Sequence, residues 1–337
     1  AFSRGIADLE TYFDSRQLDG RDIVGITTPF YLAYQEENNR ELLAAYGRLC
    51  AKLMKRWRDQ QAVSDKPAAA AGTAVRVGIV SAFVRNHSVW NAIVKGWLRH
   101  LDRNAIELHV FCLGVERDDE TDWARSRVQS FEQGAKGLRE WVDTNARKQV
   151  DILIYPEIGM DPMTVKLASL RLAPVQMGAW GHPETTGLPT IDYYLSAEAF
   201  EPPAQNANYS EKLVALPNLG SCYTPLPVTS IEPDLARLGI GSDGAILVCP
   251  GTPYKYAPQH DFVFVEIARR LGKCRFVFFT WQIRALSELL RRRLEASFDA
   301  AGLNFSDYGV FVPWQSTPGF YGLMKRADVF LDTIGFS

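Results

Sequence analysis

The 337-residue sequence is 47% hydrophobic and 23% charged, and its formal net charge is −2 at pH 7. This composition predicts a folded chain that is long enough for two domains with separate cores. The balanced charge disfavours nucleic acid and anionic membrane surfaces as partners, because both attract strongly basic proteins. The sequence has no apolar stretch long enough for a membrane span and no signal peptide at its start, so we expect a cytoplasmic protein.

The cysteines give no sign of a metal site or of a disulfide framework. They form no CxxC pair and lie far apart, at Cys50, Cys112, Cys222, Cys249 and Cys274. We therefore expect reduced thiols, no metal and no cofactor. The chain begins without Met and ends directly after a strand-like pattern, which indicates a piece of a longer protein.

The first 60 residues predict a helical segment. Between residues 23 and 57, apolar side chains recur every three or four positions with charged residues between them. Residues 61–73 have few large apolar side chains and include a run of alanines, which is typical of a flexible connector. We expect a domain boundary in this connector.

Residues 74–230 alternate between strand and helix patterns. The predicted strands are 75–81, 108–113 and 151–155, and the predicted helices are 89–101, 138–146 and 163–170. Such alternation is typical of a mostly parallel sheet with helices on both faces. We expect a Rossmann-like domain here.

A second alternating series occupies residues 231–337. Its predicted strands are 245–249, 275–280, 310–312 and 329–331, and its predicted helices are 262–271, 283–301 and 320–326. The chain has no GxGxxG loop and no Walker A lysine, which argues against dehydrogenases and P-loop NTPases. Two Rossmann-like units in tandem are the outline of an α/β fold of GT-B type. Ligands of such sheets bind beyond the carboxyl ends of the strands, so we expect the chemistry in the loops that follow them.

Several motifs resemble, in the same order, those of the O-GlcNAc transferase catalytic region. They are Arg85-Asn86-His87-Ser88 after the first strand, followed by residues 151–156, 170–176, 181–187, 191–193, 209–213 and 328–333. The resemblance implies a GT-B fold with two domains facing across a cleft. It also implies an inverting, metal-independent transfer from UDP-GlcNAc or UDP-glucose to a protein or peptide acceptor.

Two details resemble a different branch of the same family. Gly159-Met160-Asp161-Pro162 and the histidine of Gly181-His182-Pro183 are similar to bacterial HMW1C-like enzymes, which glucosylate asparagine, whereas animal O-GlcNAc transferases have tyrosine at the His182 position. Residues 28–35 resemble the region that joins tetratricopeptide repeats to the catalytic part in bacterial relatives. No 34-residue period occurs in this chain, so any repeats would lie upstream of Ala1.

Five residues of the first domain are candidates for the active site. His87 follows the first strand, and the resemblance assigns it to the active site, where imidazole suits proton transfer or acceptor binding. His182, Thr185 and Thr186 occupy a glycine- and proline-rich loop and are predicted to bind the donor sugar or phosphate. Asp161 is a candidate for catalysis or acceptor contact. The alternatives are a capping or turn role for His87, a structural turn at His182 and a helix N-cap at Asp161.

The second domain supplies the candidates for the nucleotide. Lys255 follows the strand at 245–249, and the resemblance implies that it neutralises the diphosphate through Coulomb attraction. Thr252 and Tyr254, in the same loop, are predicted to touch the nucleotide, although animal relatives have Gln at the Thr252 position. The alternative for Lys255 is an ordinary solvated lysine.

Two further loops complete the predicted donor site. Gln282 follows the strand at 275–280 and would border the uracil or ribose, while its neighbour Trp281 could equally be a packed aromatic. Asp332 and Thr333 lead toward the diphosphate in the family. The glycine-rich continuation of that loop is absent after Ser337, so we expect weak UDP binding by this chain alone.

Three functional hypotheses follow. The first is transfer of GlcNAc, or another hexose, from a UDP-sugar to Ser or Thr of a protein. The second is transfer of glucose from UDP-glucose to Asn. The third is a non-catalytic scaffold that keeps the fold for protein binding; the presence of His87 and Lys255 argues against it.

Overall fold

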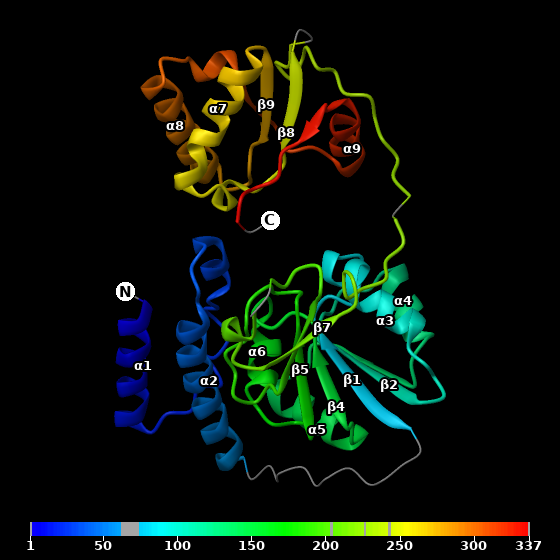
Figure 1. The fold of residues 1–337 in the computed structure, drawn as a ribbon. Helices are drawn as coiled ribbons and strands as arrows, with labels where there is room; N and C mark the ends of the chain where they lie inside the picture. The colour runs from blue at the N-terminus through cyan, green and yellow to red at the C-terminus, as the bar shows by residue number, and fades with distance from the viewer. Residues whose placement is uncertain (1, 62–73, 203–204, 226, 242–243, 336–337) are drawn as a thin grey trace. The chain divides into compact units, whose positions relative to one another are not determined.

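The computed structural model describes residues 2–61, 74–202, 205–225, 227–241 and 244–335. Its contacts divide the chain into two units (Figure 1). The first comprises Ala1–Ala33 and Glu37–Thr224, and the second comprises Tyr34–Glu36 and Pro225–Ser337. The helical segment therefore groups with the first sheet. Apart from Gln61, the predicted connector at 61–73 lies outside the described residues.

The first unit contains a seven-stranded parallel sheet in the order β3-β2-β1-β4-β5-β6-β7. Its strands are β1 (Val75–Ser81), β2 (Ile106–Cys112), β3 (Ser130–Gln133), β4 (Ile152–Tyr155), β5 (Val175–Ala179), β6 (Tyr193–Ala197) and β7 (Lys212–Leu216). After β3 the chain returns to the other side of β1. This reversal makes the edge between β1 and β4 the topological switch point, where ligands of doubly wound sheets bind.

Helices cover both faces of this sheet, as the alternating sequence pattern predicted (Figure 1). Val77 and Ile79 of β1 share a core with Trp90 on one face, and Val80 shares another core with Trp141 on the other face. The first face carries α3 (Lys95–His100) and α4 (Asp119–Arg125). The second face carries α2 (Arg40–Gln60), α5 (Leu138–Lys148) and α6 (Pro162–Ala168). Side chains that alternate along a strand thus fill two separate cores.

The helix predicted at 89–101 differs from a regular α-helix in its first part. Residues Trp90–Val94 form a π-helical turn, η2, before α3 begins at Lys95. Trp90 is fully buried, and its Nε1 donates to Glu120 Oε2 at 2.8 Å. Single π-turns within helices are frequent at functional sites, and this one directly follows the His87 loop.

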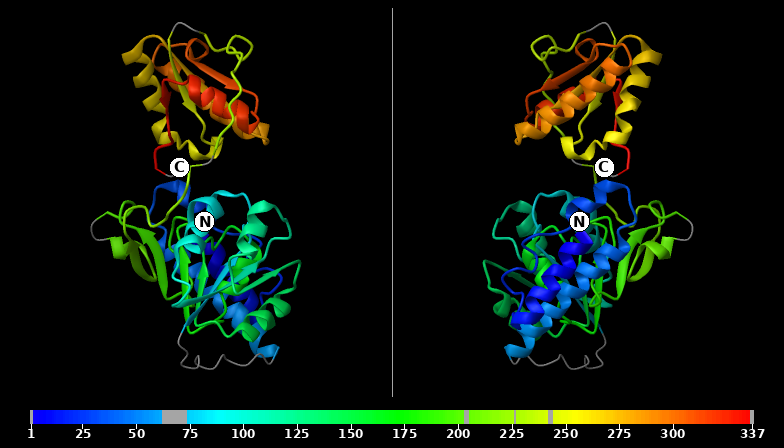
Figure 2. Two further views of the ribbon diagram at one scale, coloured as in Figure 1. Left: turned by 90° about the vertical axis from the view of Figure 1, so that its right-hand side faces the viewer. Right: turned by 90° about the vertical axis from the view of Figure 1, so that its left-hand side faces the viewer.

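The N-terminal segment forms two paired helices rather than one long helical run. In α2, residues such as Leu53 and Met54 are buried, but residues 23–29 form turns and Phe30–Gln35 form the short 3-10 helix η1. The prediction of helix from residue 23 was therefore wrong before Arg40, in part because Pro29 disfavours helical backbone at Thr28. The additional helix α1 (Phe2–Arg16) packs beside α2 (Figure 2).

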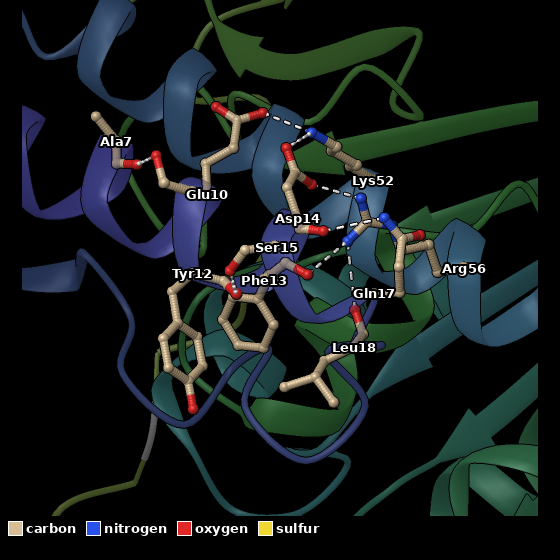
Figure 3. Close-up of polar contacts among 11 residues, drawn as sticks. Ala7, Glu10, Tyr12, Phe13, Asp14, Ser15, Gln17, Leu18, Lys52 and Arg56 are labelled. Atoms are coloured by element: carbon tan, nitrogen blue, oxygen red, sulfur yellow. Dashed lines mark hydrogen bonds and ion pairs between the residues drawn. The ribbon is translucent and has the colours of Figure 1, made fainter.

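Ion pairs join α1 to α2 along their shared side (Figure 3). Lys52 Nζ lies 2.9 Å from Glu10 Oε1 and 2.7 Å from Asp14 Oδ2, and Arg56 pairs with the other oxygen of Asp14. These charges hold the pKa of Asp14 below its usual value, with the Lys52 hydrogen bond as the largest cause. The contacts fix the register of the two helices.

The second unit contains a four-stranded parallel sheet in the order β10-β9-β8-β11. Its strands are β8 (Ala245–Cys249), β9 (Cys274–Phe279), β10 (Gly309–Val312) and β11 (Val329–Phe330), and its helices are α7 (Asp261–Leu271), α8 (Arg284–Ala300) and α9 (Thr317–Arg326). Leu247 and Phe278 pack toward α7 and α8, whereas Val248 and Val277 pack toward α9. The switch point of this sheet lies between β8 and β11.

Candidate active site

Three loops of the first unit meet at the carboxyl edge of β1, β4 and β5. The Ala82 amide, which follows β1, donates to Glu157 Oε1 in the loop after β4 at 2.9 Å. The Gly181 amide, after β5, donates to the Pro156 carbonyl at 3.0 Å. A side chain at Gly181 would lie 2.4 Å from that carbonyl, so only glycine permits this approach. These contacts join the loops that carry His87, Asp161 and His182.

His87 is half-buried in the loop between β1 and the π-helical turn. Its ring stacks on Phe83, with 4.2 Å between centroids and 20° between planes. Burial, with the Arg85 charge adding to it, lowers the pKa of His87. Because Nδ1 accepts from the Val89 amide at 3.2 Å, the proton of the neutral ring belongs on Nε2. This geometry makes His87 a hydrogen-bond donor through Nε2.

His182 is buried in the loop after β5, and its Nε2 is available to accept a hydrogen bond, whereas Nε2 of His87 donates one. Its ring lies 4.9 Å from the Phe30 ring and forms a hydrogen bond to the Phe30 backbone. Burial lowers the pKa of His182 to about 4, so the imidazole is neutral at pH 7. Within the described residues, Nε2 has no hydrogen-bond partner. A neutral ring whose other nitrogen donates to a backbone carbonyl leaves a lone pair on Nε2, which can accept a proton or a hydrogen bond.

Buried hydrogen bonds hold the His182 loop in place. The Tyr194 hydroxyl donates to the His182 carbonyl. The buried carboxylate of Glu211 accepts from the hydroxyls of Thr185 and Thr186, and from the Thr186 amide at 2.9 Å. The predicted sugar contacts of Thr185 and Thr186 remain predictions, and the geometry gives both hydroxyls a structural role first. Glu211 lies in the segment 209–213, which is one of the motifs that resemble the family. The sequence did not show that its carboxylate binds Thr185 and Thr186, because only the fold brings these residues together.

Asp161 is the N-cap of α6. Its Oδ1 accepts from the Met163 amide at 2.9 Å and from the Thr164 amide at 3.0 Å, with Pro162 at the first helical position. The capping alternative is therefore confirmed. The prediction that Asp161 also contacts the acceptor or takes part in catalysis is carried forward as a proposal.

Glu157 is a further candidate of this site, and the sequence patterns did not point to it. It directly follows the Tyr155-Pro156 end of β4, and its side chain is 0% exposed at the switch point between β1 and β4. Burial raises its pKa to about 8, and the nearby Asp161 charge acts in the same direction. A charged residue type directly after a buried strand could have drawn attention to this position.

In the second unit, Lys255, Asp332 and Thr333 come together at the switch point between β8 and β11. Lys255 ends the short 3-10 helix η4 (Pro253–Lys255), which follows β8, and Asp332 and Thr333 follow β11. Burial lowers the pKa of half-buried Lys255, while the Asp332 charge opposes this effect. A Cβ at Gly251 would lie 2.7 Å from Thr333 Cγ2, which shows how closely the two loops approach. The arrangement places a cation where sheets of this type bind phosphate groups.

Two buried hydroxyls lie in the same loop. Thr252 Oγ1 and the Tyr256 hydroxyl have no hydrogen-bond partner within the described part of the chain. The pKa of the Tyr256 hydroxyl is well above its usual value, mainly because the group is buried. Tyr254 packs against Tyr34, a residue grouped with this unit, with 5.4 Å between ring centroids. A buried hydroxyl without a partner is a potential ligand contact, which keeps Thr252 among the candidates.

Gln282 is exposed after β9, and Trp281 next to it is a packed aromatic. The Trp281 ring makes edge contacts with Tyr254 at 6.4 Å and with Trp314 at 5.3 Å. The packing alternative for Trp281 is confirmed. These side chains follow β8, β9 and β10, so they form an aromatic row along one edge of the sheet.

Neither a metal centre nor a membrane helix was found in the part of the chain that the structure describes. No group of three or more His, Cys, Asp or Glu side chains there could hold a metal ion. No helix there combines the length and the apolar character needed to cross a membrane.

Comparison with known proteins identifies the family. The family model "Glycosyl transferase family 41" matches residues 29–220, which is more than half of the chain and includes the whole seven-stranded sheet. The chain belongs to glycosyl transferase family 41. The predicted relationship to the O-GlcNAc transferase catalytic region is thus confirmed.

Individual relatives agree with this family. The chain is 30% identical over 189 residues to a probable UDP-N-acetylglucosamine–peptide N-acetylglucosaminyltransferase SPINDLY of Solanum lycopersicum, covering 54% of this chain and 19% of the relative. It is 32% identical over 99 residues to a UDP-glucose:protein N-beta-glucosyltransferase of Actinobacillus pleuropneumoniae, covering 27% of this chain and 16% of that protein. The chain thus spans less than a quarter of the length of these curated relatives.

A solved structure confirms the GT-B fold. The O-GlcNAc transferase of Thermobaculum terrenum, in a mutant form, matches the whole of this chain and 62% of its own chain, with a TM-score of 0.69 and 20% sequence identity. This likeness concerns the fold. It agrees with the two parallel sheets and the N-terminal helices of this family 41 chain.

Proposed function

We propose that the protein containing this chain transfers a hexose, with inversion, from a UDP-sugar to a protein side chain. The first candidate is transfer of GlcNAc to Ser or Thr. The acceptor oxygen attacks C1 of the sugar, the bond between C1 and the diphosphate oxygen breaks, and UDP leaves with the bonding electrons. The acceptor proton passes to a base and then to solvent. The reaction needs a proton acceptor on one side and a positive charge at the diphosphate on the other.

The observation that carries this proposal is the neutral, buried imidazole of His182 at the carboxyl edge of the first sheet. Its pKa of about 4 keeps it unprotonated at pH 7, so its Nε2 lone pair is available to accept a hydrogen bond. We propose that this nitrogen accepts a hydrogen bond from the acceptor or from the sugar. Membership in family 41 supports the reaction class.

We further propose that His87 donates a hydrogen bond through Nε2 and that Lys255 stabilises the departing diphosphate. His87 Nδ1 already accepts from the Val89 amide, which supports the donor role. Lys255 lies beside Asp332 in a half-buried loop, where a positive charge acts more strongly than in bulk water. Thr252, Tyr254, Gln282, Asp332 and Thr333 are proposed nucleotide contacts.

Transfer of glucose to Asn is the second candidate, because a relative of this chain is a UDP-glucose:protein N-beta-glucosyltransferase. The two candidates differ in donor and acceptor but share the roles of His182 and Lys255. We also propose a cytoplasmic location, which the five free cysteines support.

The test is a turnover assay on the full-length protein in the presence of EDTA. UDP-GlcNAc and UDP-glucose are each combined with matched peptides that carry a single Ser or a single Asn. Lys255→Ala is compared with Lys273→Ala, because Lys273 is an exposed lysine at the opposite, amino end of the same sheet. We expect one donor and one acceptor to be preferred, and only Lys255→Ala to abolish transfer.

Each outcome has a definite meaning. Transfer from UDP-glucose to the Asn peptide would select the second candidate. Strong loss with Lys273→Ala as well would show that the Lys255 effect is not local. Tight UDP binding without transfer to any peptide would refute the proposed acceptors. If the protein neither binds UDP nor transfers sugar, a non-catalytic scaffold that binds proteins would be favoured.

A further inference from the structure

The side chain of Glu157 is fully buried at the β1–β4 switch point. Oε1 accepts from the Ala82 amide at 2.9 Å, and the Ser81 side chain also interacts with the carboxyl group; both contacts lower its pKa, but burial outweighs them. Oε2 is buried and has no hydrogen-bond partner among the described residues. Because a buried carboxylate with an unpaired oxygen is highly unfavourable, the group is expected to carry a proton.

Glu157 also lies against the three loops of the first unit that hold His87, Asp161 and His182. Its side chain binds the first amide of the loop that leads to His87. Its carbonyl accepts from the Met160 amide at 3.3 Å, just before Asp161. Its Cβ packs close to Gly181, the residue before His182: a Cβ added at Gly181 would lie only 3.2 Å from it.

We infer that Glu157, in its neutral acid form, is a positioning residue that sets the relative placement of the His87 and His182 loops. This inference rests on the proposed transferase function. As an acid, Glu157 satisfies the Ala82 amide without placing a negative charge beside the site. Its ionisation would create an unpaired buried charge and strain the contacts between the loops.

The charged and titratable groups around Glu157 favour the neutral form. From the loop before α6, Asp161 contributes a negative charge. From the end of β2, the Cys112 thiol interacts with Glu157, and burial raises the pKa of this thiol, so it stays neutral and adds no charge. From the loop after β5, His182 is neutral above pH 4. The interactions resolved for the Glu157 carboxyl include no cation to stabilise its anion.

The pKa of about 8 gives the inference a measurable signature. The folded protein keeps the Glu157 proton between pH 4.5 and 8, whereas the unfolded chain releases it near pH 4.5. The folded state therefore binds more protons in this range, and the stability contribution of Glu157 falls as the pH rises from 4.5 to 8. Activity that depends on the neutral acid should decline above about pH 8.

The experiment compares Glu157→Gln, Glu157→Ala and the control Glu140→Gln in the full-length protein, because Glu140 is exposed on α5. For each variant, kcat/KM is measured from pH 6 to 9.5 and urea unfolding from pH 5 to 8. We expect Glu157→Gln to keep at least half of kcat/KM at pH 7 and to lose the decline near pH 8. Glu157→Ala should reduce kcat/KM at least tenfold, and Glu140→Gln should match the wild type.

Three results would overturn the inference. If Glu157→Gln loses as much activity as Glu157→Ala, the proton itself is needed and a positioning role is wrong. If the decline near pH 8 persists in Glu157→Gln, it belongs to another group. If unfolding of wild type and Glu157→Gln has the same pH dependence, Glu157 is not held neutral. The unfolding measurement needs no turnover, so it distinguishes failure of this inference from failure of the transferase proposal.

Discussion

Replacing Lys255 with Met should reduce kcat far more than it weakens substrate binding. Methionine keeps most of the volume of the lysine stem but removes the positive charge that lies beside Asp332. A charge about 4 Å from a phosphate oxygen contributes roughly 4 kcal/mol at an effective dielectric constant of about 20. Part of this energy already acts on the bound UDP-sugar, because its diphosphate is charged before the reaction.

Only the charge that develops during the reaction affects kcat. Removing one comparable stabilising group from an active site lowers kcat by about 10²- to 10³-fold, which corresponds to about 3–4 kcal/mol. We therefore expect a 10²- to 10³-fold lower kcat for Lys255→Met and a KM for the UDP-sugar that changes much less. The fractional exposure of Lys255 favours the lower part of this range, since water screens part of its charge.

The assay is steady-state transfer with the preferred UDP-sugar and peptide, at several salt concentrations. Lys255→Arg preserves the charge and should recover part of kcat, while Lys273→Met removes an exposed lysine and should leave kcat within twofold. Circular dichroism and UDP binding confirm that each variant is folded. A kcat for Lys255→Met within threefold of wild type would refute the assignment of Lys255 to the leaving group.

The other predictions concern groups that the structure shows to be buried. His182→Phe should abolish turnover. In the wild type, the free energy of unfolding should fall by about 3 kcal/mol as the pH drops from 6.5 to 4, because only the unfolded chain protonates His182 in that range. Urea unfolding from pH 4 to 7 should show that His182→Phe lacks this decrease. Glu211→Gln should destabilise the first unit by about 1–3 kcal/mol in urea unfolding, since an amide cannot accept all the Thr185 and Thr186 hydrogen bonds. Phe278→Ala should cost about 3–5 kcal/mol in thermal unfolding of the second unit, and equal stability would refute its core role.

Sequence patterns predicted the strands and helices best where burial alternates strongly. The strand at 245–249 matches β8 in both bounds, because consecutive residues there fill two different cores. The short strands β3, β5, β6 and β7 were not predicted. All four residues of β3 are only partly buried, so their sequence shows no apolar alternation. Residues 130–133 form a strand because they pair with β2, and a contact between residues this far apart cannot be read from the sequence of the strand itself.

The sequence indicated which loops carry the candidate residues, but it could not predict the hydrogen-bond partners of their side chains. Histidines in loops after strands could be identified from the sequence, and the fold places His87 and His182 at the same edge. Which nitrogen is available could not be predicted, since it depends on Val89 for one ring and on Phe30 for the other. The role of Glu157 was also hidden, because its burial arises from loops distant in the sequence.

The four-stranded sheet repeats the order of the first four strands of the seven-stranded sheet, but the two switch points hold chemically different groups. Burial without a counterion dominates in the first unit, so His182 and Glu157 are both neutral near pH 7. In the second unit, half-buried Lys255 lies beside the Asp332 carboxylate, which helps to keep it protonated. A neutral imidazole suits hydrogen bonding to a sugar or an acceptor side chain, whereas a cation suits a diphosphate. A negative charge on Glu157 would be buried without a counterion in the first unit, so we expect activity to fall when this carboxyl ionises.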